Sequence, residues 1–273
     1  MNSGKKNDVV IFIPYLPEAE SYAIPKFKVE SEICEQGLPV PPVEIRLGSV
    51  KKTENYLNWA KPQVATMLEI VKKSGFEFSV GKRILDFGCG TLRMIRCLKP
   101  LSETCEIWGT DINSEHIYWA NKYLRPYFNF ATTTTIPHLP FEDKYFDFIY
   151  AGSVFTHIDD LTDAWFLELK RILSDNGRLY ITIHDLHSLE LLNSDDRPDW
   201  KNSWLTSRIN KDKVYIENKD NFGVYISMRG PDSQVFYDED YFRDLVKPVF
   251  EILDIVPEAY GYQTAVLLKR KNK

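Results

Sequence analysis

The chain has 273 residues, 44% of them hydrophobic and 14% aromatic, so it can bury a full core and is long enough for one large domain with an elaboration. Its formal net charge of −5 argues against a nucleic-acid partner, because proteins that bind a phosphate backbone usually carry a basic face. The four cysteines have no metal-like spacing and no apolar run is long enough to span a membrane, so we expect a cytoplasmic protein without nucleic-acid or membrane partners.

The first part of the chain, residues 1–60, is interpreted as an N-terminal extension. Its six prolines up to residue 42 exclude a long helix, and we expect it to lie on the surface of a main domain that spans residues 61–273. A helix is predicted over residues 61–73, because apolar residues recur there at helical spacing. Tyr56 and Trp59 precede this helix and either pack under a loop or close over a ligand.

A glycine turn follows a short apolar strand predicted at residues 83–87. The turn contains Gly88 and Gly90, where the missing Cβ atoms let a ligand approach main-chain N–H groups, and the helix after it adds a partial positive charge at its N-terminus. Such a turn is also an ordinary connection of any α/β protein. The next strand, residues 106–111, ends at Asp111, where a carboxylate is placed to accept ribose hydroxyls. The two features together favour a nucleotide-type ligand.

Strands and helices alternate through the middle of the chain. In chain order the pattern predicts elements at residues 83–87, 91–98, 106–111, 114–125, 128–132, 146–151, 161–173 and 178–183. Alternation with right-handed crossovers gives a doubly wound sheet whose ligand crevice lies at the carboxyl ends of the strands. Two further strands, at residues 250–255 and 263–269, form an antiparallel pair. We therefore predict an α/β fold with a mostly parallel, seven-stranded sheet and an antiparallel last strand.

An inserted segment at residues 184–235 interrupts this alternation before a helix predicted at residues 238–246. Residues 211–217 and 222–228 are able to form a hairpin within it. The segment is too long for a connector, so we interpret it as a substrate cover, with a partner surface or a satellite core as alternatives. Its rings suit a cover that walls off water: Trp200, Trp204, Tyr215, Phe222 and Tyr225.

The motifs, taken in this order, resemble the class I S-adenosylmethionine (SAM)-dependent methyltransferases. The resemblance rests on DFGCG at residues 86–90, on Asp111, and on LPFEDKYFDFI at residues 139–149. The stretch at residues 165–183 is similar to that family's helix and fifth strand. One difference lies at Leu92, where the family usually has a third glycine. The resemblance implies a Rossmann-like fold, SAM as the cofactor and methyl transfer as the activity.

The resemblance also implies which residues hold the cofactor. The backbone around Gly88 and Gly90 would take the methionine end of SAM, and Asp86 would orient it through N–H groups or water. The carboxylate of Asp111 would accept the ribose hydroxyls.

The remaining cofactor contacts are expected after the second, third and fourth strands. Ile112 would pack on the adenine, and Thr133 or Thr134 would lie near the adenine amine. Ser153 would line the side of the site that carries the methyl group.

Methyl transfer from a sulfonium needs the acceptor, the methyl carbon and the sulfur in line, and a hydroxyl acceptor must also lose a proton. His157 and His184 lie just beyond the carboxyl ends of predicted strands, so either is a candidate general base. His157 could equally bond to the backbone of its own loop. We expect no metal, because the end of the fourth strand offers no carboxylate to a divalent ion.

The leading hypothesis is methyl transfer to a hydroxyl or amine of a small-molecule acceptor, such as a sugar or a natural product. An NAD(P)-dependent oxidoreductase shares the strand, the turn and the distal acid, but the last glycine of its G-x-G-x-x-G pattern would fall at Arg93. A SAM-binding protein without catalysis is the other alternative. The sequence predicts no particular oligomeric state.

Overall fold

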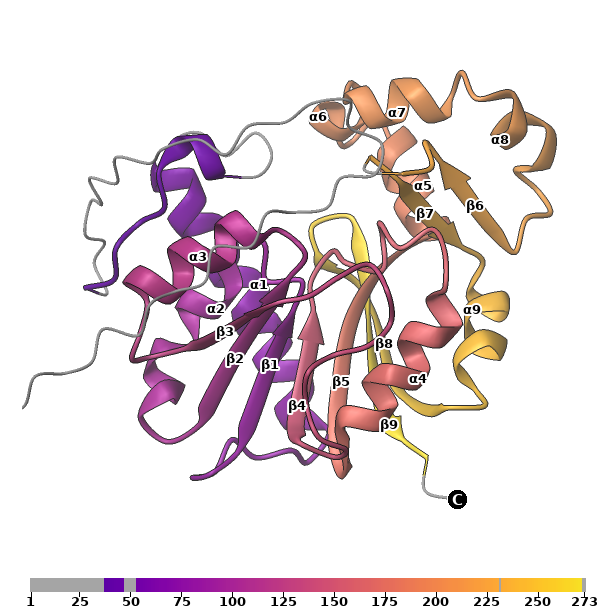
Figure 1. Cartoon of the computed structure of the whole chain (residues 1–273). Coiled ribbons are helices and arrows are strands. Elements are labelled where there is room, and N and C mark those ends of the chain that lie inside the picture. Colours follow the sequence, from indigo (N-terminus) through magenta and orange to yellow (C-terminus); the bar gives the residue numbers. More distant parts are fainter. Residues whose placement is uncertain (1–36, 47–52, 231, 272–273) are drawn as a thin grey trace, which may run out of the picture.

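One mixed sheet organises the residues that the computed structural model describes, which are 37–46, 53–230 and 232–271 (Figure 1). Most of the predicted N-terminal extension lies outside these residues. Nine strands of the described residues form the sheet: β1 (Arg83–Phe87), β2 (Glu106–Asp111), β3 (Asn129–Thr132), β4 (Phe146–Ala151), β5 (Leu173–Asp185), β6 (Val224–Ser227), β7 (Gln234–Tyr237), β8 (Phe250–Tyr260) and β9 (Gln263–Arg270).

The strand order confirms the predicted α/β class with a mostly parallel sheet. Strands β3, β2, β1, β4 and β5 are neighbours in that order and run parallel. Strand β9 pairs antiparallel with β5, and β8 pairs antiparallel with β9. The predicted count of seven strands was too low, because β6 and β7 extend the sheet. β7 pairs with the far end of β5, where His184 lies opposite Phe236, and β6 pairs with β7.

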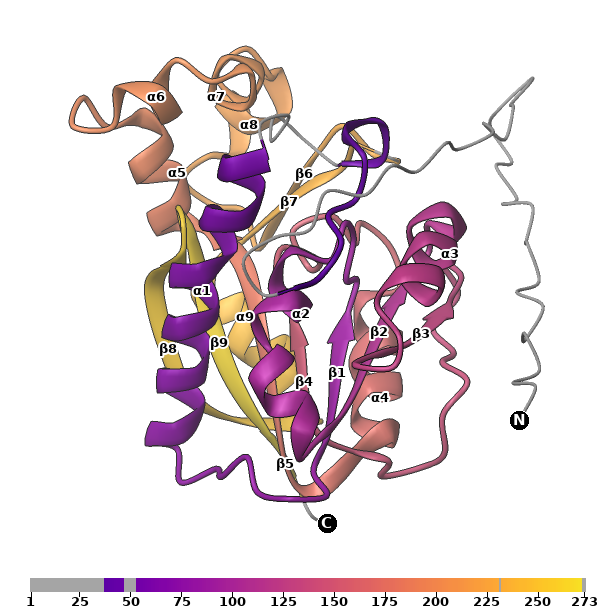
Figure 2. The ribbon, with the colours of Figure 1, turned by 90° about the vertical axis from the view of Figure 1, so that its left-hand side faces the viewer.

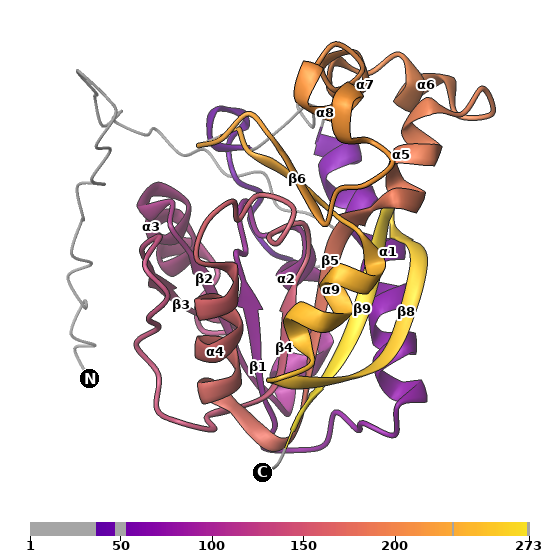
Figure 3. The same cartoon turned by 90° about the vertical axis from the view of Figure 1, so that its right-hand side faces the viewer.

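Helices cover both faces of this sheet, as Figures 2 and 3 show. On one face lie α1 (Thr53–Lys73), α2 (Arg93–Cys97) and α3 (Ser114–Tyr123), and on the other lie α4 (Thr162–Ile172) and α9 (Glu239–Val246). Each face has its own buried apolar cluster, because each helix turns one apolar stripe toward the strands. Two short 3-10 helices complete this part, η1 (Val43–Ile45) and η2 (Lys99–Glu103). No helix of the described residues is both long and apolar enough to cross a membrane.

Helix α1 begins at Thr53, well before the predicted start at residue 61, and Pro62 lies inside it. A proline in a helix interior removes a backbone hydrogen bond and usually interrupts the helix. Here Tyr56, which is 1% exposed, is buried against the core on the N-terminal side of the proline. Tertiary packing of this early turn therefore keeps the helix continuous, and Tyr56 and Trp59 belong to the helix instead of preceding it.

Helices α3 and α4 differ in how they are capped. Asn113, and not Ser114, caps α3, because its side chain accepts hydrogen bonds from the Glu115 and His116 N–H groups. Helix α4 has no side-chain cap, since Leu161 precedes it in a left-handed conformation with φ 55°. Strand β5 begins at Leu173, before the predicted start at residue 178, and contains Asn176 and Gly177.

The inserted segment stands over the carboxyl end of β5 (Figure 1). It contains β6 and four short helices: α5 (Leu186–Asn193), α6 (Pro198–Lys201), α7 (Trp204–Ile209) and α8 (Lys213–Asn218). The predicted hairpin is wrong, because one of its strands is the helix α8 and β6 pairs with β7 instead. Four of the five rings pack around a small separate core, and the fifth, Trp204, is 63% exposed. The satellite-core alternative thus describes most of these rings.

Candidate cofactor and acceptor site

The glycine turn after β1 uses its N–H groups within the protein. The N–H groups of Gly88 and Cys89 donate to the Thr110 carbonyl at 2.8 and 2.9 Å, and the Gly90 N–H donates to Asp111 Oδ2 at 2.7 Å. The expectation that these groups face a ligand is therefore wrong for the N–H of Gly88 and Gly90. The hydrogen bonds from these N–H groups hold the turn against the end of β2. Helix α2 is only five residues long, so its dipole contributes little.

Gly88 and Leu92, in and after this turn, have positive φ angles, and at Gly88 there is also no room for a Cβ atom. Gly88 has φ 74°, and a Cβ there would lie 2.4 Å from Val154 Cγ2, in the loop after β4. Leu92 has φ 71°, a conformation that costs a leucine roughly 1–2 kcal/mol. Its side chain is 1% exposed, and this burial offsets the strain. The chain therefore keeps a glycine-like backbone at position 92 without a glycine.

Asp111 is fixed at the end of β2 by three hydrogen bonds. Oδ2 accepts from the Gly90 N–H, and Oδ1 accepts from the Asn113 N–H at 2.8 Å. The carbonyl of Asp111 accepts from the Thr133 N–H at 2.9 Å. Because each carboxylate oxygen has a second lone pair, the partly exposed carboxylate can still accept two hydroxyl donors. This matches the geometry that a ribose diol requires.

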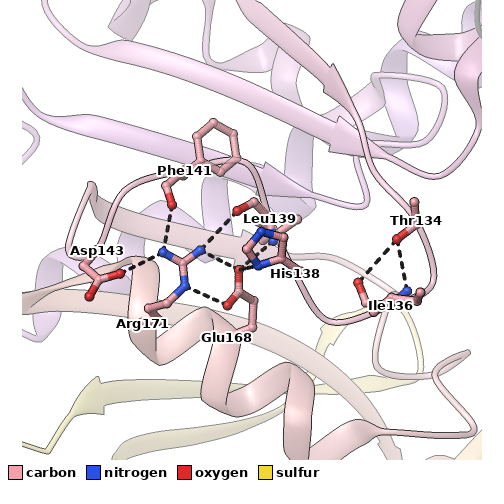
Figure 4. A network of polar contacts seen from close by, with 8 residues as sticks. All are labelled: Thr134, Ile136, His138, Leu139, Phe141, Asp143, Glu168 and Arg171. Atoms are coloured by element: carbon pink, nitrogen blue, oxygen red, sulfur yellow. Dashed lines mark hydrogen bonds and ion pairs between the residues drawn. The ribbon is translucent and has the colours of Figure 1, made fainter.

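The residues expected around the adenine have different environments. The Ile112 side chain is 58% exposed beside Asp111, as a surface that stacks on a ring would be. Thr133 is 9% exposed and is held by its N–H. The Thr134 hydroxyl accepts from the Ile136 N–H at 3.2 Å, so it is used in a local turn (Figure 4). Of the two threonines, Thr133 is the one without such a turn contact.

The loop after β3 is held against α4 by a buried carboxylate (Figure 4). Glu168, 7% exposed, accepts from the Leu139 N–H at 2.6 Å and from Arg171 Nη2 at 2.7 Å. Arg171 also donates to the carbonyls of Leu139 and Phe141 and pairs with Asp143 at 2.8 Å. Burial raises the pKa of Glu168, but the bonds from Arg171 and the Leu139 N–H outweigh it and leave the pKa below its usual range.

Asp86, at the end of β1, has a carboxyl oxygen without a partner. The residue is 2% exposed and Oδ2 makes no hydrogen bond. Burial raises the pKa of Asp86 to about 8, partly opposed by the nearby Tyr150 hydroxyl and supported by the charge of Asp111. An orphaned buried carboxyl of this kind is suited to a cationic group from outside the chain, such as the ammonium of a methionine moiety. The residues at this end of the site therefore fit SAM.

Ser153 belongs to a polar cluster at the carboxyl ends of β4 and β5 and the start of the antiparallel strand β9. Its N–H donates to Thr182 Oγ1 at 2.7 Å, and its hydroxyl accepts from Gln263 Nε2 at 2.8 Å. Thr182 in turn donates to Gln263 Oε1 at 2.6 Å, and the Thr156 hydroxyl lies 3.2 Å from that of Ser153. Sequence reasoning missed Gln263 and Thr182, because a glutamine and a threonine in strands carry no pattern that marks them.

His157 lies on the exposed side of the loop after β4. Its Nδ1 is 2.7 Å from the carbonyl oxygen of Ser233, just before β7. A carbonyl can only accept, so we assign the proton to Nδ1, which leaves Nε2 with a free lone pair. A bond to the backbone of the histidine's own loop was one alternative, but the bond observed is to the end of the inserted segment.

His184, the other candidate base, is enclosed. Its ring is 1% exposed, with ring centroids of Phe236 and Tyr262 at 4.7 and 5.3 Å on its sides. Neither ring nitrogen has a hydrogen-bond partner, and burial lowers its pKa to about 3, helped by the charge of His157. Such a weakly basic, covered imidazole does not suit proton abstraction from an acceptor. The geometry favours His157 of the two.

Comparisons with known proteins point to one family. Residues 85–181 match the model of a methyltransferase domain. A search of curated protein sequences found no match to this chain.

Three solved structures show the same fold. A SAM-dependent methyltransferase from Clostridium acetobutylicum ATCC 824 has a TM-score of 0.55 and 16% identity, over 78% of this chain and 92% of that one. A protein from Pyrococcus horikoshii OT3 has a TM-score of 0.52 and 18% identity, over 80% and 95% of the two chains. A SAM-dependent methyltransferase from Aquifex aeolicus has a TM-score of 0.51 and 15% identity, over 80% and 93%.

The matched domain includes the glycine turn, Asp111 and the LPFEDKYFDFI run. These are the motifs on which the resemblance was based, and they set aside the oxidoreductase alternative. The methyltransferase-domain model over residues 85–181, together with the fold shared with these structures, supports a class I SAM-dependent methyltransferase.

Proposed function

We propose that the protein transfers the methyl group of SAM to a hydroxyl or amine of a small-molecule acceptor, with His157 as the general base. The observation that carries this proposal is the 2.7 Å contact between His157 Nδ1 and the Ser233 carbonyl, which assigns the proton to Nδ1 and leaves the lone pair on Nε2. The side chain is exposed after β4, next to the Ser153 cluster. A base in that position can reach an acceptor that lies over the carboxyl end of the sheet.

Four cofactor contacts are part of this proposal. When bound, SAM supplies a methyl group already activated by its sulfonium. The free lone pairs of Asp111 accept the ribose hydroxyls, and Ile112 covers one face of the adenine. Thr133 lies near the adenine amine. Asp86 orients the methionine end of SAM by accepting a hydrogen bond from its ammonium group.

Proton removal is the second task of the protein. His157 Nε2 takes the proton of the acceptor as the acceptor attacks, and the Nδ1–H keeps its bond to the Ser233 carbonyl. That bond holds the ring orientation and stabilises the imidazolium that forms. The inserted segment, residues 184–235, limits the access of water and contributes to the choice of acceptor.

A panel of small hydroxyl and amine compounds with labelled SAM tests the proposal. We expect methyl incorporation into at least one small compound. Binding of S-adenosylhomocysteine without transfer to any member of the panel, or transfer only to protein or nucleic acid, would contradict the small-molecule assignment.

Replacing Asp111 by alanine should weaken binding of S-adenosylhomocysteine at least tenfold. Each lost charge-assisted bond to a ribose hydroxyl contributes roughly 1.5–3 kcal/mol. Titration calorimetry measures the affinity, and Asp244→Ala, a change of an exposed carboxylate on α9, is the control. Equal affinities of the Asp111 variant and the wild type would remove Asp111 from the cofactor site.

Binding of S-adenosylhomocysteine at pH 7 should release about one proton through Asp86. The free carboxyl, with its pKa raised to about 8, is mostly protonated at pH 7, and pairing with an ammonium group favours the ionised form. Calorimetry in two buffers with different ionisation enthalpies measures the release. Asp86→Asn should abolish it and weaken binding, so a release that persists in this variant would assign the proton to another group.

A further inference from the structure

We propose that Arg93 binds the carboxylate of the methionine moiety, so that Arg93 and Asp86 together recognise an α-amino acid zwitterion. Arg93 is the first residue of α2, directly after the glycine turn. This proposal rests on the proposed function, and it assigns a role to a residue that neither the motifs nor the resemblance singled out.

The guanidinium of Arg93 lacks an acceptor. Its Nη1 is buried and makes no hydrogen bond, and no carboxylate of the described residues pairs with Arg93. Arg96, one turn later on the same helix, is different, because it donates to the carbonyls of Leu38 and Pro39. Arg93 is partly buried, and a buried N–H group of a cation without an acceptor is costly, which points to an acceptor supplied by a ligand.

The orientation of Arg93 is fixed by aromatic rings. The guanidinium carbon lies 4.1 Å from the centroid of Trp59, on α1, and the Trp59 ring is 6.1 Å from that of Tyr260. The Tyr260 ring also reaches the end of β4, since its Cε2 lies 3.3 Å from the position that a Cβ of Gly152 would take. This contact places Arg93 at the carboxyl edge of the sheet, where α1, α2 and β4 meet.

Asp86 lies close to the same ring. Asp86 lies opposite Tyr150 on the neighbouring strand β4, two residues before the Gly152 position that the Tyr260 ring contacts. In agreement with this placement, burial raises the pKa of the Tyr260 hydroxyl, the charge of Arg93 lowers it and that of Asp86 raises it. The two groups do not pair with each other, and each has an unpartnered buried atom. An orphaned carboxyl and an orphaned guanidinium near one ring match the ammonium and the carboxylate of one amino acid.

The test compares S-adenosylhomocysteine with its decarboxylated analogue, which keeps the amine and lacks only the carboxylate. Arg93→Met should weaken binding of S-adenosylhomocysteine about tenfold to a hundredfold and change binding of the analogue less than about threefold. Arg93→Lys should be intermediate, because an ammonium lacks the planar fork that matches a carboxylate. Arg83→Met, the same charge change on a half-exposed residue of β1, is the matched control.

The binding measurements separate the role of Arg93 from the proposed function. Unchanged affinity of the Arg93 variants for S-adenosylhomocysteine overturns the proposal, as does an equal loss for both ligands, which would indicate a role in packing against Trp59. Binding of the analogue with wild-type affinity shows that the variant site is folded. If the wild-type protein binds neither ligand, the proposed function itself is contradicted, together with the role of Arg93.

Discussion

His157→Gln should lower kcat about a hundredfold to ten-thousandfold while leaving the affinity for S-adenosylhomocysteine unchanged. Loss of a positioned general base typically has an effect of this size. The proposed cofactor contacts do not involve His157, whose Nδ1 bonds to the Ser233 carbonyl. Turnover is measured with the acceptor that the compound panel identifies, and affinity by calorimetry.

Two other histidines provide controls for this experiment. His138→Gln changes an exposed histidine beside Glu168 and should leave kcat unchanged. His184→Phe keeps a flat ring between Phe236 and Tyr262 and should also retain turnover. A low kcat for His184→Phe with normal turnover of the His157 variant would reverse the assignment of the base.

Glu168→Ala should lower the free energy of unfolding by about 2–4 kcal/mol. Breaking a buried ion pair costs about 3–5 kcal/mol, and the 28% exposure of the Arg171 side chain reduces this figure. The substitution also leaves the Leu139 N–H without its acceptor. Denaturant unfolding measures the change, and a loss below about 1 kcal/mol would show that the carboxylate does not hold the loop after β3.

The exposed pair Glu239–Arg243 on α9 is the matched control, with an Arg243 Nη2 to Glu239 Oε1 distance of 2.6 Å. Glu239→Ala should change stability by no more than about 0.5 kcal/mol. The Glu168 contribution also depends on pH. Because its folded pKa lies below the unfolded value, its contribution is complete above the unfolded pKa and is lost as the pH falls through the folded pKa. The difference between wild type and Glu168→Ala should therefore shrink in acid.

Much of the core was predictable from local pattern. The bounds of β1, β2 and β4 match the predicted strands, because short apolar runs between turns can form only buried strands of an alternating α/β chain. Asp111 was predicted at the end of β2 for the same reason, since a strand boundary and a carboxylate can both be found in the sequence.

Other features depend on contacts between distant parts of the chain. The continuity of α1 through Pro62 comes from the burial of Tyr56, and α8 forms where a hairpin strand was predicted. Strand β7 joins the sheet only because β5 extends past its neighbours to His184 and Asp185. No local pattern encodes such pairings, and tertiary packing overrides propensity there.

The sequence by itself predicted the resemblance to the methyltransferases, the alternation of the central strands and helices, and the positions of Asp86 and Asp111 near strand ends, because these depend on motifs whose residues are close in the chain. The tertiary structure is what favours His157 over His184 as the proposed base, and it shows that the buried Nη1 of Arg93 has no acceptor among the described residues. Both distinctions depend on burial and on partners far away in sequence, such as Ser233 for His157 and Trp59 for Arg93. The exposure of a side chain and its hydrogen-bond partners are set only when segments distant in sequence pack together in the folded protein.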